Sequence, residues 1–356
     1  MSARPPAPAR GPFGGPGPSA LLSAFFPPAI GFLVLGALLA AAWAAGAGDD
    51  DLRWTALHLL LLGGVSQLIL GAGQFFSCAF LATTPPSPRM LAAQLACWNT
   101  GTPLVTAGHA LAGSAALTGA GAALIAAGLV LFALGLRGMQ QRSLQRARWA
   151  LRWYYASAAC LTAGTLIGAA MASAVAWRHG SLLGAHLALN LGGWCGTAIV
   201  GTLHTFFPSL TGTPLRHARL QGPTFLAWVA GVALLAAGAA ANVVALLVAG
   251  WLLVLTAAAL LSINMLASVR AAQAGLSRVP RILAAAHVAL AAGLLVALVA
   301  TVRSGAMAPF TGDAQPVVAA LLLGGWIAST VLASLVHLLR LLARVRRLRA
   351  GIGAAR

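Results

Sequence analysis

Histidine is the residue type of this chain that is best suited to chemistry in an apolar environment. Six of the eight histidines fall within long apolar runs: His58, His109, His186, His204, His287 and His337. Imidazole is the usual axial ligand of a b-type haem and a good ligand for copper. Polar side chains inside a membrane are costly, so these residues are candidates for function. The plainer alternative is that each neutral histidine hydrogen-bonds another helix.

Carboxylates and thiols offer no comparable chemistry. The four acidic residues, Asp49, Asp50, Asp51 and Asp313, all lie outside the apolar runs. General acid–base catalysis by Asp or Glu is therefore excluded inside the membrane, as is a proton path built from carboxylates. The four cysteines lie within apolar runs and form no CxxC pair, so neither a disulfide framework nor a zinc site is expected.

The composition is that of an all-α integral membrane protein. Hydrophobic residues make up 60% of the 356 residues and charged residues 7%, whereas soluble domains carry about 25% charged residues. The net charge of +18 comes from arginines in short segments between the apolar runs. We therefore expect them to anchor the protein to anionic lipid headgroups of the bilayer, and we expect no nucleic-acid partner.

The apolar runs predict ten membrane spans, because about 30 Å of hydrocarbon needs some 20 residues of helix. They lie near 27–47, 54–82, 90–112, 115–136, 152–177, 182–207, 223–241, 243–269, 281–302 and 316–342. The run from 223 to 269 is too long for one span and predicts a tight hairpin at Asn242. Residues 1–20 are predicted to form a disordered Pro/Gly-rich tail, 21–342 the transmembrane domain and 343–356 a basic tail.

The arginines predict the orientation. All 22 basic residues are arginines. Nineteen fall at the termini or in alternate connections between the spans, and only Arg53, Arg178 and Arg303 fall in the other set of connections, to which all four acids belong. By the positive-inside rule, both termini are cytoplasmic in a multi-pass protein of the bacterial cell (inner) membrane. This topology places His58, His109 and His186 towards the outer face. It places His204, His287 and His337 near the inner face. His186 and His204 are 18 residues apart on one helix, about 27 Å, so they cannot serve one centre.

A Gly-Gly pair recurs every four spans. Outside the tail it occurs at Gly63-Gly64, Gly192-Gly193 and Gly324-Gly325, at intervals of 129 and 132 residues, in spans 2, 6 and 10. A histidine precedes the pair in spans 2 and 6, and a polar residue follows it in all three. Chance is an alternative in a chain so rich in Gly and Leu, but the pattern indicates an internal repeat.

Two segments resemble the haem-copper oxidase subunit I superfamily, especially its cbb-type branch. In the stretch AHLALNLGGWCGTAIVGTLHTFFPSLTG, residues 185–212, the order of His, Gly-Trp, Gly, Phe-Phe and Pro is similar to a histidine-bearing helix of that family. The segment at His58 resembles helix 2 of the family, in which an outer-side histidine followed by Gly-Gly binds a low-spin haem. The resemblance implies a fold of four-helix arcs in which helices 2, 6 and 10 are related.

A closer resemblance is to the membrane region that precedes cupredoxin or multicopper-oxidase domains of the copper nitrite reductase type in some bacterial proteins. The segments HLLLLGGVSQLIL, RWYYASAACL and HLALNLGGWCGTAIVGTLHTFFPSL carry it, and it covers most of residues 54–270. It implies a partner of this copper-protein class, which we expect to be a separate chain.

The chain departs from the oxidase pattern where copper is bound. Span 7 has no histidine, and span 10 has only His337 in place of a His-x-His pair. The resemblance therefore implies a single b-type haem, with His58 and His186 as metal ligands and His109 and His204 as further cofactor-binding candidates. Electrons are expected to pass between membrane quinol and an extracytoplasmic copper or haem protein.

Two other functions stay open. The chain could bind or transport copper through His58, His109 and His186 with nearby thiols. It could instead be a non-catalytic assembly subunit whose histidines only hold helices together.

Overall fold

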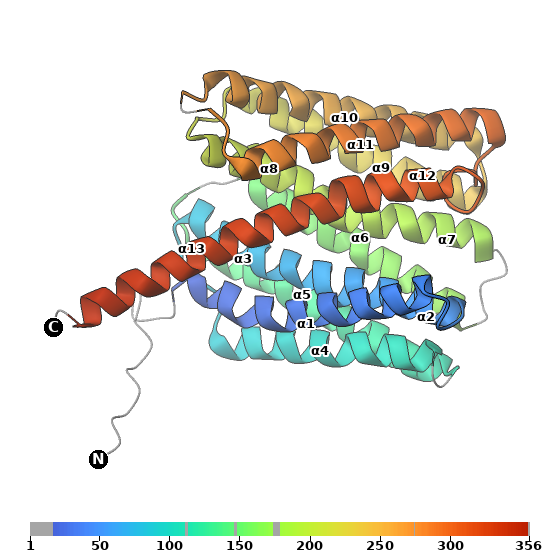
Figure 1. Cartoon of the computed structure of the whole chain (residues 1–356), viewed down its shortest axis with the longest axis horizontal. Coiled ribbons are helices and arrows are strands. Elements are labelled where there is room, and N and C mark those ends of the chain that lie inside the picture. The colour runs from blue at the N-terminus through green and yellow to red at the C-terminus, as the bar shows by residue number, and fades with distance from the viewer. Residues whose placement is uncertain (1–16, 111–112, 146–147, 174–178, 274, 355–356) are drawn as a thin grey trace, which may run out of the picture. The chain divides into compact units, whose positions relative to one another are not determined.

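The chain is helical throughout the part that the structure describes. The computed structural model describes residues 17–110, 113–145, 148–173, 179–273 and 275–354. Its elements are α1 (Ser19–Ala44), α2 (Asp50–His58), η1 (Leu59–Val65), α3 (Ser66–Leu81), α4 (Pro88–Ala110), α5 (Ala115–Arg142), α6 (Arg148–Ala172), α7 (His179–Leu187), η2 (Ala188–Gly196), α8 (Thr197–Thr211), η3 (Ala218–Leu220), α9 (Gln221–Ala241), α10 (Val244–Ala271), α11 (Arg278–Ser304), α12 (Gln315–Ala319), η4 (Ala320–Ala328) and α13 (Ser329–Ala354) (Figure 1).

The long helices correspond to the predicted spans. Nine helices within the described ranges are long and apolar enough to cross a membrane, and α4 is a further long but less apolar helix. The hairpin predicted at Asn242 is confirmed: α9 ends at Ala241, Asn242 is left-handed with φ +58°, and α10 begins at Val244. Asparagine tolerates this conformation better than most residues, which favours the sharp reversal.

The two ends of the chain differ from the predicted boundaries. The first helix begins at Ser19, ahead of the predicted start at 27, and the last continues to Ala354, past the predicted end at 342. Residues 343–354 are rich in Ala and Arg, which are strong helix formers, so the helix continues past the predicted boundary. Residues 1–16 of the predicted tail lie outside the described residues.

The helices form two compact units. One comprises Met1–Thr102, Ala127–Arg148 and Leu338–Arg356, and the other comprises Pro103–Ala126 and Trp149–His337. His58 therefore belongs to the first unit. The other three candidate ligands, His109, His186 and His204, belong to the second.

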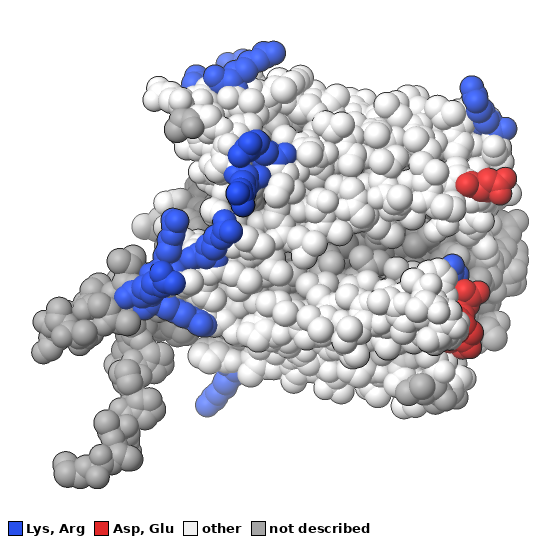
Figure 2. All heavy atoms as spheres, viewed as in Figure 1, with Lys and Arg blue, Asp and Glu red and all other residues white. Residues whose placement is uncertain are grey.

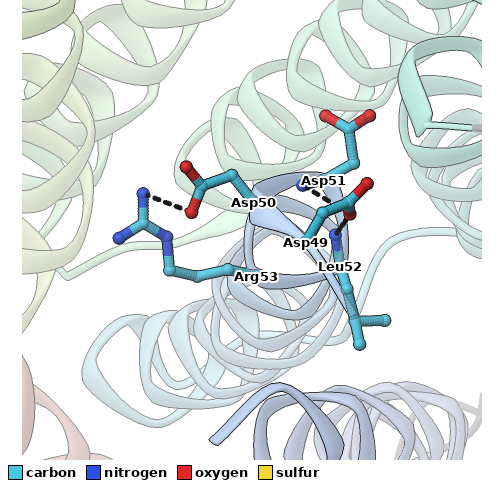
Figure 3. A network of polar contacts seen from close by, with 5 residues as sticks. All are labelled: Asp49, Asp50, Asp51, Leu52 and Arg53. Atoms are coloured by element: carbon cyan, nitrogen blue, oxygen red, sulfur yellow. Dashed lines mark hydrogen bonds and ion pairs between the residues drawn. The ribbon is translucent and has the colours of Figure 1, made fainter. Parts of the chain in front are cut away.

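Charged side chains gather at the ends of the helices, as Figure 2 shows. The acidic cluster begins α2: Asp49 Oδ1 accepts hydrogen bonds from the backbone N–H groups of Asp51 at 3.1 Å and Leu52 at 3.3 Å (Figure 3). Arg53 pairs with Asp50 at 3.3 Å. Negative charge at a helix N-terminus is favourable, so the helix that carries His58 has a well-defined start.

Each of the three Gly-Gly pairs lies in a π-helical segment. These segments are η1, η2 and η4, and each interrupts a longer α-helix. A π turn leaves one backbone carbonyl without its usual N–H donor. In each of the three segments a Ser or Thr hydroxyl replaces that donor and bonds to the carbonyl five residues earlier. The three bonds are Ser66–Leu61 at 2.7 Å, Thr197–Gly192 at 3.4 Å and Ser329–Gly324 at 3.0 Å.

A tryptophan on α4 donates its indole N–H to η1, and a tryptophan on α9 donates its indole N–H to η2. Trp98 Nε1 donates to the Leu62 carbonyl at 2.9 Å, and Trp228 Nε1 donates to the Gly192 carbonyl at 3.1 Å. In both cases the tryptophan comes 36 residues after its acceptor. The two π segments are therefore stabilised in the same way within their own units.

The second glycine of each pair allows the preceding long helix to approach closely. A Cβ at Gly64 would lie 2.5 Å from Leu33 Cδ2, at Gly193 2.5 Å from Cys160 Cβ, and at Gly325 2.8 Å from Ala289 Cβ. A Cβ atom is not found this close to another atom, so any side chain at these positions would force its neighbour to shift. The three glycine-bearing helices thus share a π turn, a hydroxyl bond and a close contact with the helix before them.

Candidate functional site

The His186 side chain is held by the neighbouring helix. Its Nδ1 lies 2.9 Å from the carbonyl oxygen of Gly164 on α6. In the neutral tautomer that donates this bond, Nε2 carries the lone pair. A histidine that binds a metal usually has its other ring nitrogen tied in this way. A fixed backbone group therefore holds the His186 ring in one orientation.

Two glycines of α6 make room for this arrangement. A Cβ at Gly168 would lie 2.9 Å from His186 Cε1, and a Cβ at Gly164 would lie 2.8 Å from Asn190 Cγ. Asn190 also donates from Nδ2 to the His186 carbonyl at 2.8 Å. Small residues four positions apart, such as Gly164 and Gly168, permit this close contact between the two helices.

Further polar contacts fix the position of α6 along the His186 helix. Ser157 Oγ donates to the Trp194 carbonyl in η2 at 2.8 Å, and the Tyr154 and Thr202 hydroxyls lie 2.8 Å apart. Together with the Gly164 bond they extend over about three turns of α6. Tyr154, Ser157 and Thr202 were not predicted from the sequence as residues that position the two helices.

His58 has a similar setting within its own unit. Its Nδ1 lies 2.9 Å from the Trp54 carbonyl, and its ring stacks on the Trp54 indole with centroids 3.7 Å apart. The π segment η1 begins at the next residue. Farther along the helix, Gln67 is fully buried, and neither polar atom of its amide has a hydrogen-bond partner among the described residues.

His204 is the most deeply buried of the candidate ligands, with 1% of its surface exposed. Its Nδ1 lies 2.9 Å from the Val200 carbonyl, and its Nε2 has no partner in the described part of the chain. The ring stacks on Trp153 with centroids 5.7 Å apart. His186 lies 18 residues earlier on the same continuous helix. The two imidazoles are therefore too far apart to bind one metal centre.

The other three histidines of the long apolar helices have different settings. His109 is exposed in the last turn of α4. His287 is buried, with Nε2 at 2.8 Å from the Ser262 hydroxyl and 3.0 Å from the Ala258 carbonyl of α10. The ring of His337 packs edge-on against Phe206. His287 thus joins two helices, which is the plainer role expected for a histidine in a membrane protein.

Within the described residues, no group of three or more His, Cys, Asp or Glu side chains is placed to hold a metal ion. Three of the four candidate ligands, His58, His186 and His204, are instead single imidazoles whose Nδ1 atoms lie 2.9 Å from backbone carbonyls. Such imidazoles can bind the iron of a haem, which supplies its other four ligands itself. No protein-family model and no curated protein sequence matches the chain.

Proposed function

We propose that this chain is a membrane electron-transfer protein that binds one b-type haem through His58 and His186. The shared setting of these two histidines supports the proposal. Each Nδ1 lies 2.9 Å from a backbone carbonyl, and each residue comes one or two positions before a π turn. Single π turns inside α-helices are frequent at functional sites. A bound b-type haem would supply a one-electron redox couple.

The residues around His186 would keep its ring ready for binding. The Gly164 carbonyl selects the tautomer, raises the basicity of Nε2 and prevents the ring from rotating. Glycines at 164 and 168 let the two helices approach until the imidazole contacts the α6 backbone. The ring therefore loses little conformational freedom when it binds a ligand.

The likeness of the three glycine-bearing helices supports a four-helix repeat of the oxidase subunit I kind. Each has a π turn, a hydroxyl bond across it and a glycine against the preceding long helix. The proposal excludes the binuclear copper site of the oxidases, because α9 contains no histidine and the last long helix contains only His337.

The proposed orientation places the arginine-rich helix ends and both termini on the cytoplasmic side of a bacterial inner membrane. His58 and His186 then lie towards the outer face, where the electron acceptor would be a separate copper or haem protein. The electron donor would be a quinol in the bilayer. Oxidation of one quinol to quinone releases two protons and two electrons, so it reduces two one-electron acceptor molecules.

Anaerobic addition of a short-chain quinol to the purified, haem-loaded protein tests this donor. We expect the α-band of reduced b-type haem to appear, and we expect it to disappear when an oxidised cupredoxin is added. The His287→Ala protein should behave like the unaltered chain, because His287 has a helix-joining role. Haem that dithionite reduces but quinol does not would contradict the proposed donor.

A further inference from the structure

The second unit contains an apolar cavity of about 110 Å³. Residues of α7, η2, α9, α10, α11, α12 and η4 line it, together with the connection between α11 and α12. Two of the three π segments therefore contribute to its walls. No charged side chain lines it, and Gln315 is the one polar lining residue besides the tryptophans. Such a cavity selects against charged and strongly hydrated ligands.

The size of the cavity suits a single ring. An apolar cavity of about 150 Å³ in another protein stays dry and binds benzene. Aromatic side chains form much of the wall: Trp228, Trp251, Trp326 and Phe310. Flat aromatic walls favour a planar ligand that can stack against them or meet them edge-on. A flexible acyl chain would gain less from these walls.

One buried hydrogen-bond donor in the wall lacks a partner. Trp228 Nε1 donates to the Gly192 carbonyl, and Trp251 Nε1 donates to the Thr301 hydroxyl at 3.0 Å. Trp326 is only 3% exposed, yet its Nε1 has no partner among the described residues. A buried donor without an acceptor is costly, so a ligand with a carbonyl oxygen would relieve this cost where a hydrocarbon would not.

We propose that this cavity binds the headgroup of a membrane quinone. A quinone ring is planar, uncharged and lipophilic, and it carries the carbonyl acceptor that the Trp326 indole lacks. This inference rests on the proposed function, in which quinol is the electron donor. It adds the site at which the quinol ring binds, and it assigns to the Trp326 indole N–H a hydrogen bond to a ring oxygen.

Equilibrium binding of a tritiated short-chain benzoquinone to the full chain in lipid nanodiscs tests the proposal. We expect saturable binding of one quinone per protein. Ala319→Phe, which places a ring in the cavity, should abolish it. Ala259→Phe on the exposed face of α10 makes the same change outside the cavity, and it should leave binding unchanged. A melting curve of each variant shows whether it is folded.

A second pair of variants tests the hydrogen bond. Trp326→Phe keeps an aromatic wall but removes the N–H group, and it should weaken binding about fivefold. Trp149→Phe makes the same change at a tryptophan that does not line the cavity and should have no effect. Unlabelled benzoquinone should displace the label, whereas an alkylbenzene of equal size should compete at least fivefold less well.

The results separate this inference from the proposed function. Saturable quinone binding that Ala319→Phe removes supports the site, whether or not the chain contains haem. Non-saturable binding, equal binding by Ala319→Phe, or equal competition by alkylbenzene would overturn it. A haem protein with no quinone site in this cavity would leave the haem proposal intact and refute only the cavity.

Discussion

We expect His186→Ala to abolish the low-spin haem spectrum of the purified protein. The substitution removes the one imidazole of its helix whose Nδ1 is bonded to the Gly164 carbonyl at 2.9 Å, and alanine offers no group that binds iron. Loss of that hydrogen bond should cost only about 1 kcal/mol of stability. Absorption spectra of the reduced and oxidised proteins, taken beside a melting curve, therefore separate loss of haem from loss of fold.

His58→Ala should have the same spectral effect, and His287→Ala is the matched control. His287 is also a buried membrane histidine, but its ring joins α11 to α10 through Ser262 and Ala258. Its removal should cost at most about 1–2 kcal/mol of packing and leave the spectrum unchanged. Added imidazole should restore the spectrum of His186→Gly. An unaltered spectrum in His186→Ala would show that this residue is not a haem ligand.

Gly193→Ala should destabilise the protein by about 1–3 kcal/mol, the usual cost of overpacking. The new methyl group would lie 2.5 Å from Cys160 Cβ and 2.9 Å from its Sγ. A Cβ cannot turn away, so α6 must shift from η2. That shift would strain the Gly164–His186 bond, and we expect weaker haem retention as well as a lower melting temperature.

The neighbouring glycine provides the control. A Cβ at Gly192 meets only Val232 Cγ2, at the ordinary contact distance of 3.4 Å. Gly192→Ala should therefore be close to neutral, and slightly stabilising where alanine favours the helix. Equal melting temperatures for the two variants would contradict the close α6 contact.

The sequence predicted where the long helices lie, but it did not predict the π turns inside three of them. Apolar length and the break at Asn242 were sufficient to place the long helices, because hydrocarbon thickness constrains them. The π turns were not predicted, since a π turn depends on a local shift of hydrogen bonds that hydropathy does not record. The recurring Gly-Gly pair followed by Ser or Thr (Ser66, Thr197 and Ser329) was the available signal, and its hydroxyls bond across each turn.

The candidate ligands were identified from the sequence, but the backbone carbonyls and rings that hold them in place were not. The Gly164 carbonyl lies 22 residues before His186, so the pairing depends on how α6 packs, which no local pattern shows. The close contact that allows it depends on Gly164 and Gly168, at which a Cβ would meet the Asn190 and His186 side chains. For His204, burial and the stacking on Trp153 became visible only in the fold.

The most direct test of the central claim is the haem content of the purified protein, measured by a pyridine haemochrome assay beside metal analysis. We expect one b-type haem per chain, with a Soret band and a low-spin spectrum. A protein with no Soret band and no extractable haem would contradict it, and copper found in place of haem would favour the copper-binding alternative.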